Sequence, residues 1–207
     1  MTTCFTDRMM ALRRTLVFMC FAAVLPIAPV QAVDPASVSL PKQTKPGLYV
    51  DAREAYALKQ RLGDKALFVD IRTRAEISYV GMPALVDAHI PILEHPDNAP
   101  WDDKNHRFKM ELNTGFGAEM QRRLAERGLT KNDTVILICR SGDRSARAAD
   151  LLFAEGYKNI YTVIDGFEGD MQKEGPDAGR RAVNGWKNSG LPWRYELDKN
   201  KMFLQGR

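Results

Sequence analysis

The sequence predicts an α/β fold in which a doubly wound, mainly parallel sheet is flanked by helices. Short apolar runs of strand length are separated by amphipathic segments of helical length. The strongest strand candidate is 134–138, which is β-branched, apolar and continuous, as expected for a central strand that is buried on both faces. Because strands that alternate with helices favour crossover connections, we expect the sheet to be mainly parallel.

The first elements are bounded by cap signals. Asp51 and Glu54 have the spacing of a capping box, so a helix is expected to begin there and to end near Gly63. The apolar run that follows predicts a buried strand over 66–70. A second strand is expected within 86–92, although a proline near its end weakens the pattern.

The later elements alternate in the same way. Residues 93–114 are polar and contain two prolines, which predicts a long surface loop. Helices are expected from Phe116 to Arg127 and from Arg144 to Glu155, each closed by a glycine, with a strand from Asn159 to Val163. Residues 168–184 are rich in glycine and charge and predict a loop insertion. The aromatic residues that follow are expected to pack back on the domain.

The N-terminal segment 1–32 has the pattern of a secretory signal peptide. Three arginines precede an apolar run from 16 to 30, and Ala32 stands at the expected cleavage site. The prolines in this run and its short length argue against a retained membrane anchor. We therefore expect a periplasmic or secreted protein from which 1–32 have been removed.

The rest of the chain is the size of one domain. We assign 33–46 to an extended or mobile lead-in, 47–195 to the domain and 196–207 to a C-terminal tail. Three of the 30 basic and one of the 26 acidic residues leave with the signal peptide, so the mature net charge is +2. Because no long basic run with interleaved aromatics is present, nucleic acid is not an expected partner.

The cysteines point to one position. Cys4 and Cys20 lie in the predicted signal peptide, so Cys139 is the only cysteine of the mature chain. Exported proteins meet an oxidising compartment, where cysteines are usually paired. A lone thiol in that setting is either buried and inert or retained for its reactivity.

Cys139 opens a strand-to-helix loop whose composition favours anionic sulfur. A turn at Gly142 allows several backbone N–H groups to point inward at a helix N-terminus, which stabilises the nucleophilic thiolate. Arg140 and Arg144 add positive charge that can hold an anionic donor. The two serines of the loop offer hydroxyl donors, and Ser145 is expected to cap the helix. The remaining loop residues are thus Ser141, Asp143 and Ser145.

This loop resembles the active-site loop of single-domain rhodaneses, Cys-Arg-Ser-Gly-x-Arg-Ser. The similarity extends over about 47–193, including an Asp-x-Arg strand end at Asp70 and Arg72 and the acidic position at Glu76. Later segments also resemble the family, at 156–157, 165–167, 185–187 and 190–192. The resemblance implies a rhodanese-like fold and a sulfurtransferase without a cofactor.

The resemblance also implies residue roles. Cys139 would take the outer sulfur of a donor such as thiosulfate as a persulfide and pass it to cyanide or a protein thiol. The donor would be held by Arg140 and Arg144, while backbone amides from 140 to 145 surround the sulfur. Asp70 would orient the loop, with Arg72 in support, or would simply cap its strand.

The sequence departs from the rhodanese pattern in two segments, and three alternatives to a sulfurtransferase remain. Residues 81–91 replace the family's usual Gly-His-Ile-Pro-Gly-Ala, and the 168–184 insertion is longer than a minimal domain needs. A non-turnover sulfur carrier would have the same loop. A phosphatase or arsenate reductase of this fold would need a longer loop than the four residues between Cys139 and Arg144. Metal binding is not expected, because the histidines are scattered and are expected in loops or at the surface, at His89, His95 and His106.

Overall fold

The computed structural model describes residues 33–204 and the first residue of the chain, so the predicted signal peptide lies outside the described residues. Its centre is a sheet in the order β1-β10-β9-β2-β4, in which every neighbouring pair is parallel. The strands of this sheet are β1 (Leu48–Val50), β2 (Ala66–Asp70), β4 (Ala88–His89), β9 (Thr134–Ile138) and β10 (Asn159–Val163). The predicted fold class is confirmed.

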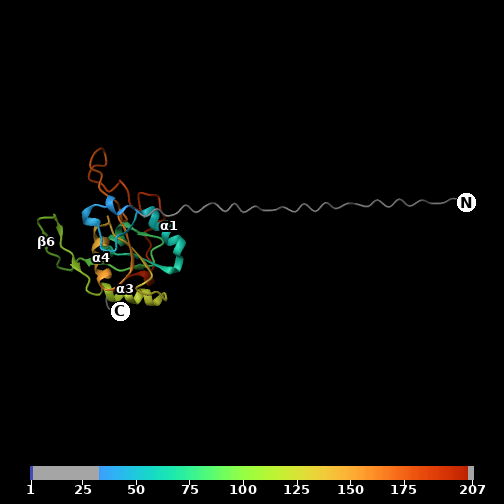
Figure 1. Cartoon of the computed structure of the whole chain (residues 1–207). Helices are drawn as coiled ribbons and strands as arrows, with labels where there is room; N and C mark the ends of the chain where they lie inside the picture. The colour runs from blue at the N-terminus through green and yellow to red at the C-terminus, as the bar shows by residue number, and fades with distance from the viewer. Residues whose placement is uncertain (2–32, 205–207) are drawn as a thin grey trace.

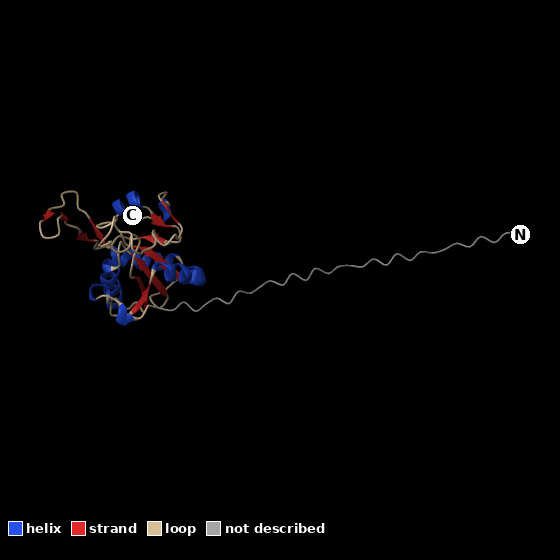
Figure 2. Cartoon of the chain, turned by 90° about the horizontal axis from the view of Figure 1, so that it is seen from above, coloured by secondary structure: helices blue, strands red, loops and turns tan. Residues whose placement is uncertain are grey.

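Helices cover both faces of the sheet (Figure 2), and the alternation of side chains along the strands explains why. In β9, Ile136 and Ile138 belong to one buried cluster and Val135 and Leu137 to the other. The first cluster includes apolar residues of α1 and α2, and the second those of α3 and α4. The helices are α1 (Ala52–Leu62), α2 (Arg74–Val80), α3 (Phe116–Glu126) and α4 (Asp143–Ala154).

The cap signals at the start of the domain are confirmed. The Asp51 carboxylate accepts the Glu54 N–H at 2.8 Å, the Glu54 carboxylate accepts the Asp51 N–H at 2.8 Å, and Gly63 ends α1. The expected strand over 86–92 was wrong in extent, because only β4 pairs with β2. The edge strand ends at His89, and Pro91 has no N–H group with which to continue the hydrogen bonds between strands.

Residues 93–112 form an extended β arm instead of the predicted loop. Its base pairs β5 (Leu93–Glu94) with β8 (Glu111–Leu112), and its outer part pairs β6 (Trp101–Asp102) with β7 (Arg107–Phe108). The outer pair is braced by the Trp101 and Phe108 rings, which meet edge to face with centroids 5.3 Å apart. The arm stands out from the body of the domain (Figure 1). Each pairing is two residues long, too short to produce an alternating pattern.

The segments at both ends of the described chain pack on the domain. The lead-in forms short 3₁₀ turns, and the Lys42 ammonium lies 2.9 Å from the Asp170 carboxylate. The lead-in, expected to be extended or mobile, thus contains two short turns and one ion pair to the domain. In the tail, the backbone carbonyls of Asn200 and Met202 accept hydrogen bonds from Arg123.

The aromatic segment after the insertion packs back as expected. The Trp186 side chain is fully buried, with its ring centroid 5.5 Å from that of Phe68. A small antiparallel pair, β3 (Met82–Pro83) with β11 (Trp193–Arg194), joins this segment to the chain after α2.

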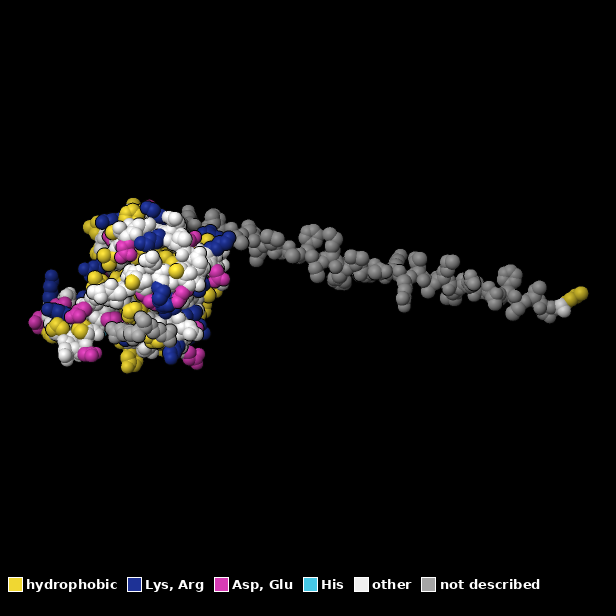
Figure 3. All heavy atoms as spheres, turned by 90° about the horizontal axis from the view of Figure 1, so that it is seen from below, with side chains coloured by type: hydrophobic (Ala, Val, Ile, Leu, Met, Phe, Trp, Pro, Cys, Tyr) yellow, Lys and Arg dark blue, Asp and Glu magenta, His cyan; other side chains and the backbone are white. Residues whose placement is uncertain are grey.

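Apolar, basic and acidic side chains are interspersed on the face shown in Figure 3. Among the described residues, we find no helix that combines the length and the hydropathy needed to cross a membrane.

Candidate active site

The loop that begins at Cys139 lies at the carboxyl end of β9, where parallel α/β sheets place their sites. The helix α4 starts at Asp143, so the connection is only four residues long. Gly142 makes this tight turn with φ of 103°, a conformation that side chains with a Cβ rarely adopt.

The loop is locked against the turn that follows β10. A Cβ on Gly142 would lie 2.2 Å from the Ile164 carbonyl oxygen, and a Cβ on Gly166 would lie 2.6 Å from the Arg140 backbone. Both glycines are therefore needed for the two segments to approach this closely. Close contact between these two backbone segments therefore holds the loop in its conformation.

Hydrogen bonds across this contact orient the loop amides. The carbonyl of Cys139 accepts the Phe167 N–H at 2.8 Å, and the carbonyl of Arg140 accepts the Glu168 N–H at 3.0 Å. In a trans peptide the N–H points opposite to the C=O. The N–H groups of Arg140 and Ser141 therefore face away from the turn, and no acceptor for them is found among the described residues.

The Cys139 thiol lies beside these amides and the helix terminus. The Gly142 N–H donates to Sγ at 3.1 Å. Unlike α1 and α2, whose first turns are closed by capping boxes, α4 has no side-chain cap. Its first N–H groups are left for another acceptor, and the helix dipole favours a negative one. The predicted capping role of Ser145 was wrong, because α4 begins two residues before it.

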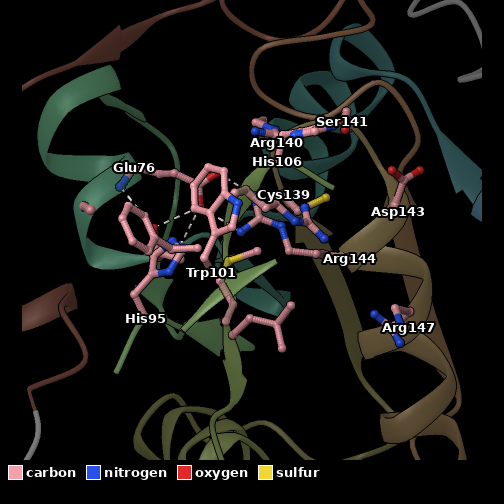
Figure 4. A pocket seen from close by; sticks show the side chains of 16 residues that line it. Glu76, His95, Trp101, His106, Cys139, Arg140, Ser141, Asp143, Arg144 and Arg147 are labelled. Atoms are coloured by element: carbon pink, nitrogen blue, oxygen red, sulfur yellow. Dashed lines mark hydrogen bonds and ion pairs between the residues drawn. The ribbon is translucent and has the colours of Figure 1, made fainter. Parts of the chain in front are cut away.

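Cys139 is 1% exposed but borders a cavity of about 550 Å³. In Figure 4, Arg140 and Arg144 lie on the loop side of this cavity, while Trp101 and His95 of the arm lie across from them. The arm that sequence reasoning treated as a loop therefore forms a wall of the site. Its aromatic residues were the one signal that could have indicated this.

Glu76 and Arg144 form the strongest polar contact of the site. The Arg144 guanidinium binds both carboxylate oxygens of Glu76, at 2.7 and 2.5 Å, and both side chains are largely buried. Burial opposes ionisation of Glu76, but the hydrogen bonds and charge of Arg144 outweigh it and lower the pKa of Glu76 to about 2. Arg144 was expected to add positive charge that can hold an anionic donor, and the structure shows that this charge is paired with Glu76.

The model of the rhodanese-like domain family matches residues 54–173. The chain belongs to the rhodanese-like family. Its fold is therefore of the sulfurtransferase type.

Similar proteins support this assignment. The uncharacterized protein RP600 of Rickettsia prowazekii is 35% identical over 135 residues, which cover 65% of this chain and 87% of that protein. The chloroplastic protein THYLAKOID RHODANESE-LIKE of Oryza sativa subsp. indica is 31% identical over 173 residues, covering 83% of this chain and 29% of that protein. The crystal structure of Rv0390 from M. tuberculosis matches with a TM-score of 0.53 at 29% identity, covering 72% of this chain and 97% of that one.

Within this rhodanese-like domain, Arg140 is the loop arginine whose charge is not matched. No ion pair or hydrogen bond of its side chain occurs within the described part of the chain. Burial, followed by repulsion from Arg181 and Arg144, lowers the pKa of Arg140 from its usual value. Of the two arginines expected to hold an anionic donor, Arg140 is therefore the one without an acidic partner among the described residues.

Asp70 and Arg72 form a buried ion pair, and the polar contacts of their side chains are with each other and with Gly81. The Asp70 carboxylate is fully buried and binds the Arg72 guanidinium, with its closest contact at 2.6 Å. Arg72 also donates to the Gly81 carbonyl at 2.7 Å and packs over the Phe167 ring, 4.0 Å from its centroid. Since the Phe167 N–H holds the Cys139 carbonyl, this ion pair acts on the loop through Phe167.

The remaining predicted site residues occupy different positions. Ser141 and Asp143 both line the cavity, and Asp143 is exposed in the first turn of α4. The Ser145 hydroxyl is buried without a partner among the described residues. The missed residue is Glu76, which the sequence marked only as an acidic family position.

The histidines divide between core and cavity. His89 was expected in a loop or at the surface, but it is buried in β4, where its Nε2 lies 2.7 Å from the Arg72 carbonyl oxygen. His95 and His106 both line the cavity. No group of three or more potential metal ligands is found in the described ranges.

Proposed function

We propose that this rhodanese-like protein is a sulfurtransferase that carries sulfane sulfur as a persulfide on Cys139. The observation that carries the proposal is the position of the thiol. It borders the cavity, accepts the Gly142 N–H and lies at the uncapped start of α4. A terminal persulfide is anionic, so the same amides and helix dipole would stabilise it.

With thiosulfate as donor, the Cys139 thiolate attacks the outer sulfur atom. A new sulfur–sulfur bond forms to Cys139, the bond within thiosulfate breaks, and sulfite leaves with its electron pair. A thiolate or cyanide acceptor then attacks the outer persulfide sulfur and releases the Cys139 thiolate. No external oxidant or reductant is required.

Arg140 is the proposed contact for the anionic donor, because the charge of Arg144 is already matched by Glu76. Arg140→Gln is expected to raise the KM for thiosulfate more than the KM for an uncharged sulfane donor. Equal losses for both donors would contradict this role. Arg144→Gln should instead disturb the loop and lower turnover of both donors alike.

The size of the cavity supports an acceptor larger than a small inorganic ion. A cavity of about 550 Å³ is within the range that holds drug-sized molecules. Its walls include apolar side chains of the arm, Leu93, Trp101, Phe108 and Met110. An organic or protein thiol could bury apolar atoms against these side chains while its sulfur approaches Cys139.

Intact-mass analysis before and after thiosulfate tests the proposal. The purified protein should gain one sulfur atom, fragmentation should place it on Cys139, and added cyanide should remove it. Cys139→Ser should keep the native circular dichroism spectrum and gain no sulfur. Sulfur loading of that variant at another position would contradict the proposal.

Turnover assays on the same purified protein, run beside the mass analysis, separate the alternatives. A persulfide that forms without steady turnover of small acceptors would favour a carrier that delivers to one protein partner. Hydrolysis of an aryl phosphate without sulfur loading would favour a phosphatase. We also propose that the protein acts in the periplasm or outside the cell, and the mass of the purified protein tests removal of 1–32.

A further inference from the structure

A second cavity lies beside the active-site loop, between Arg140 and the 168–184 insertion. Its volume is also about 550 Å³. Residues of the insertion and of the segment that follows it form most of its wall (Figure 1 shows the insertion as a loop standing out from the domain). Its charged lining residues are Arg140, Glu168, Arg180, Arg181 and Lys187.

The positive charge of this cavity exceeds its negative charge. Arg180 is paired with Asp177 at 3.0 Å, outside the group that lines the cavity. The ion pairs of residues 33–204 include none made by Arg140, Arg181 or Lys187. Three cations therefore face a lining in which Glu168 is the one acidic side chain, while Asp170, which also attracts Arg181, is already paired with Lys42.

Neutral contacts hold two of these cations in place. The Arg181 guanidinium donates to the Gly169 carbonyl at 2.5 Å. The Lys187 ammonium lies 4.6 Å from the centroid of the Trp193 ring. A carbonyl and an aromatic face position a cation without cancelling its full charge. Both side chains are also only partly exposed, so solvent screens them incompletely.

Burial, followed by repulsion from Arg181 and Arg144, lowers the pKa of Arg140, and attraction by Glu76 and Glu168 offsets only part of this shift. An anion in the cavity would offset the repulsion. The two guanidinium groups offer forked donors that match an oxyanion, and the ammonium adds a point charge.

We propose that the cavity between Arg140 and the 168–184 insertion binds an oxyanion, with Arg140, Arg181 and Lys187 as its ligands. The site is separate from the amides around Cys139 but shares Arg140 with the proposed donor contact. Only the donor alternative given next rests on the proposed function. The oxyanion is either a free inorganic anion or the oxyanion group of a sulfur donor, since the two share one chemistry.

Titration with inorganic sulfate, followed by amide NMR shifts and calorimetry in a buffer free of sulfate and phosphate, tests the site. The largest shifts are expected at Arg181, Lys187 and their neighbours, and the affinity should fall as sodium chloride is added. Shifts confined to 139–145 would show that sulfate binds only at the Cys139 loop and would overturn the proposal.

Charge-removing variants make the test specific. Arg181→Gln and Lys187→Gln should each weaken sulfate about tenfold, as expected for loss of a hydrogen bond to a charged group. Arg61→Gln, which removes an exposed charge at the end of α1, should leave the affinity unchanged. If all three variants lose affinity equally, only net charge matters and the proposal fails. Should Arg181→Gln misfold, Lys187→Gln decides alone.

Sulfur-loading kinetics identify the source of the anion. If the oxyanion group of the donor occupies the cavity, sulfate should compete with thiosulfate, and Lys187→Gln should raise the KM for thiosulfate with kcat unchanged. If a free anion is the ligand, Lys187→Gln should weaken sulfate but leave that KM unchanged. Either result supports the site, and unaltered sulfate binding by Lys187→Gln refutes it.

Discussion

Replacing Glu76 with glutamine should cost this protein about 3 kcal/mol of folding stability at neutral pH, as judged from its pKa. The pKa of Glu76 falls from 4.5 to about 2 because the Arg144 contacts outweigh the effect of burial. Only 20% of the Glu76 side chain and 12% of the Arg144 side chain are exposed, so solvent screens the pair little. Glutamine leaves Arg144 buried without a matching charge.

Glutamine is the informative replacement because it isolates the ion pair. Glu76 also closes the capping box of α2 by accepting the Thr73 N–H at 2.9 Å, and a glutamine can fill the same position. The loss of stability would therefore report mainly on the contact with Arg144, the largest of the effects that lower the pKa of Glu76. A control is Asp177→Asn, which breaks the exposed pair with Arg180 and should cost less than about 1 kcal/mol.

Urea unfolding at several pH values is the assay. Because the folded pKa lies below the unfolded one, the stabilisation is present above pH 4.5 and is lost as the pH falls toward about 2. The gap between wild type and Glu76→Gln should therefore be constant from pH 7 to 5 and shrink below that. A variant as stable as wild type at pH 7, or a gap that does not depend on pH, would refute the reasoning.

Three further outcomes are expected. Gly142→Ala should destabilise the protein by at least about 1–3 kcal/mol and reduce sulfur loading, because the new Cβ would meet the Ile164 carbonyl. The control is Gly156→Ala, which is also at positive φ but has open space around it, and it should cost less stability and leave sulfur loading intact. Burial raises the pKa of Asp165 to about 6, so the folded protein binds this proton more tightly than the unfolded chain. As the pH falls from 7 to 4, the free energy of unfolding of the wild type, measured in urea, should rise by about 2–3 kcal/mol relative to that of Asp165→Asn. Trp101→Ala should leave thiosulfate loading unchanged and slow transfer to a large thiol acceptor, which stopped-flow assays of each half-reaction can separate.

The sequence was most informative where one local signal decides the structure. The capping box at Asp51 and the apolar run of β9 each need only neighbouring residues, and both are confirmed. The helix expected over 144–155 is observed as α4, one residue earlier at each end. The sequence did not reveal that Gly142 contacts a segment more than twenty residues later in the chain.

The parts of the site that were missed depend on contacts between distant residues. Glu76 and Arg144 are 68 positions apart, and only the fold reveals that one neutralises the other. The arm was missed for a different reason, since its strands are two residues long and are held by the pairing of Trp101 with Phe108. Neither feature produces a periodic signal in the sequence.

The backbone contacts around the 168–184 insertion have a consequence for how this domain can vary. The segment leaves the domain at Glu168, whose N–H is bound to Arg140, and returns at Gly185, whose N–H is bound to Asp165 at 2.9 Å. The two ends of the insertion, Glu168 and Gly185, are therefore both fixed to the domain by backbone N–H groups. A loop of different sequence could replace the insertion between these two fixed ends. Such a replacement could change the ligand preference of the cavity while the Cys139 thiol and its neighbouring amides keep their positions.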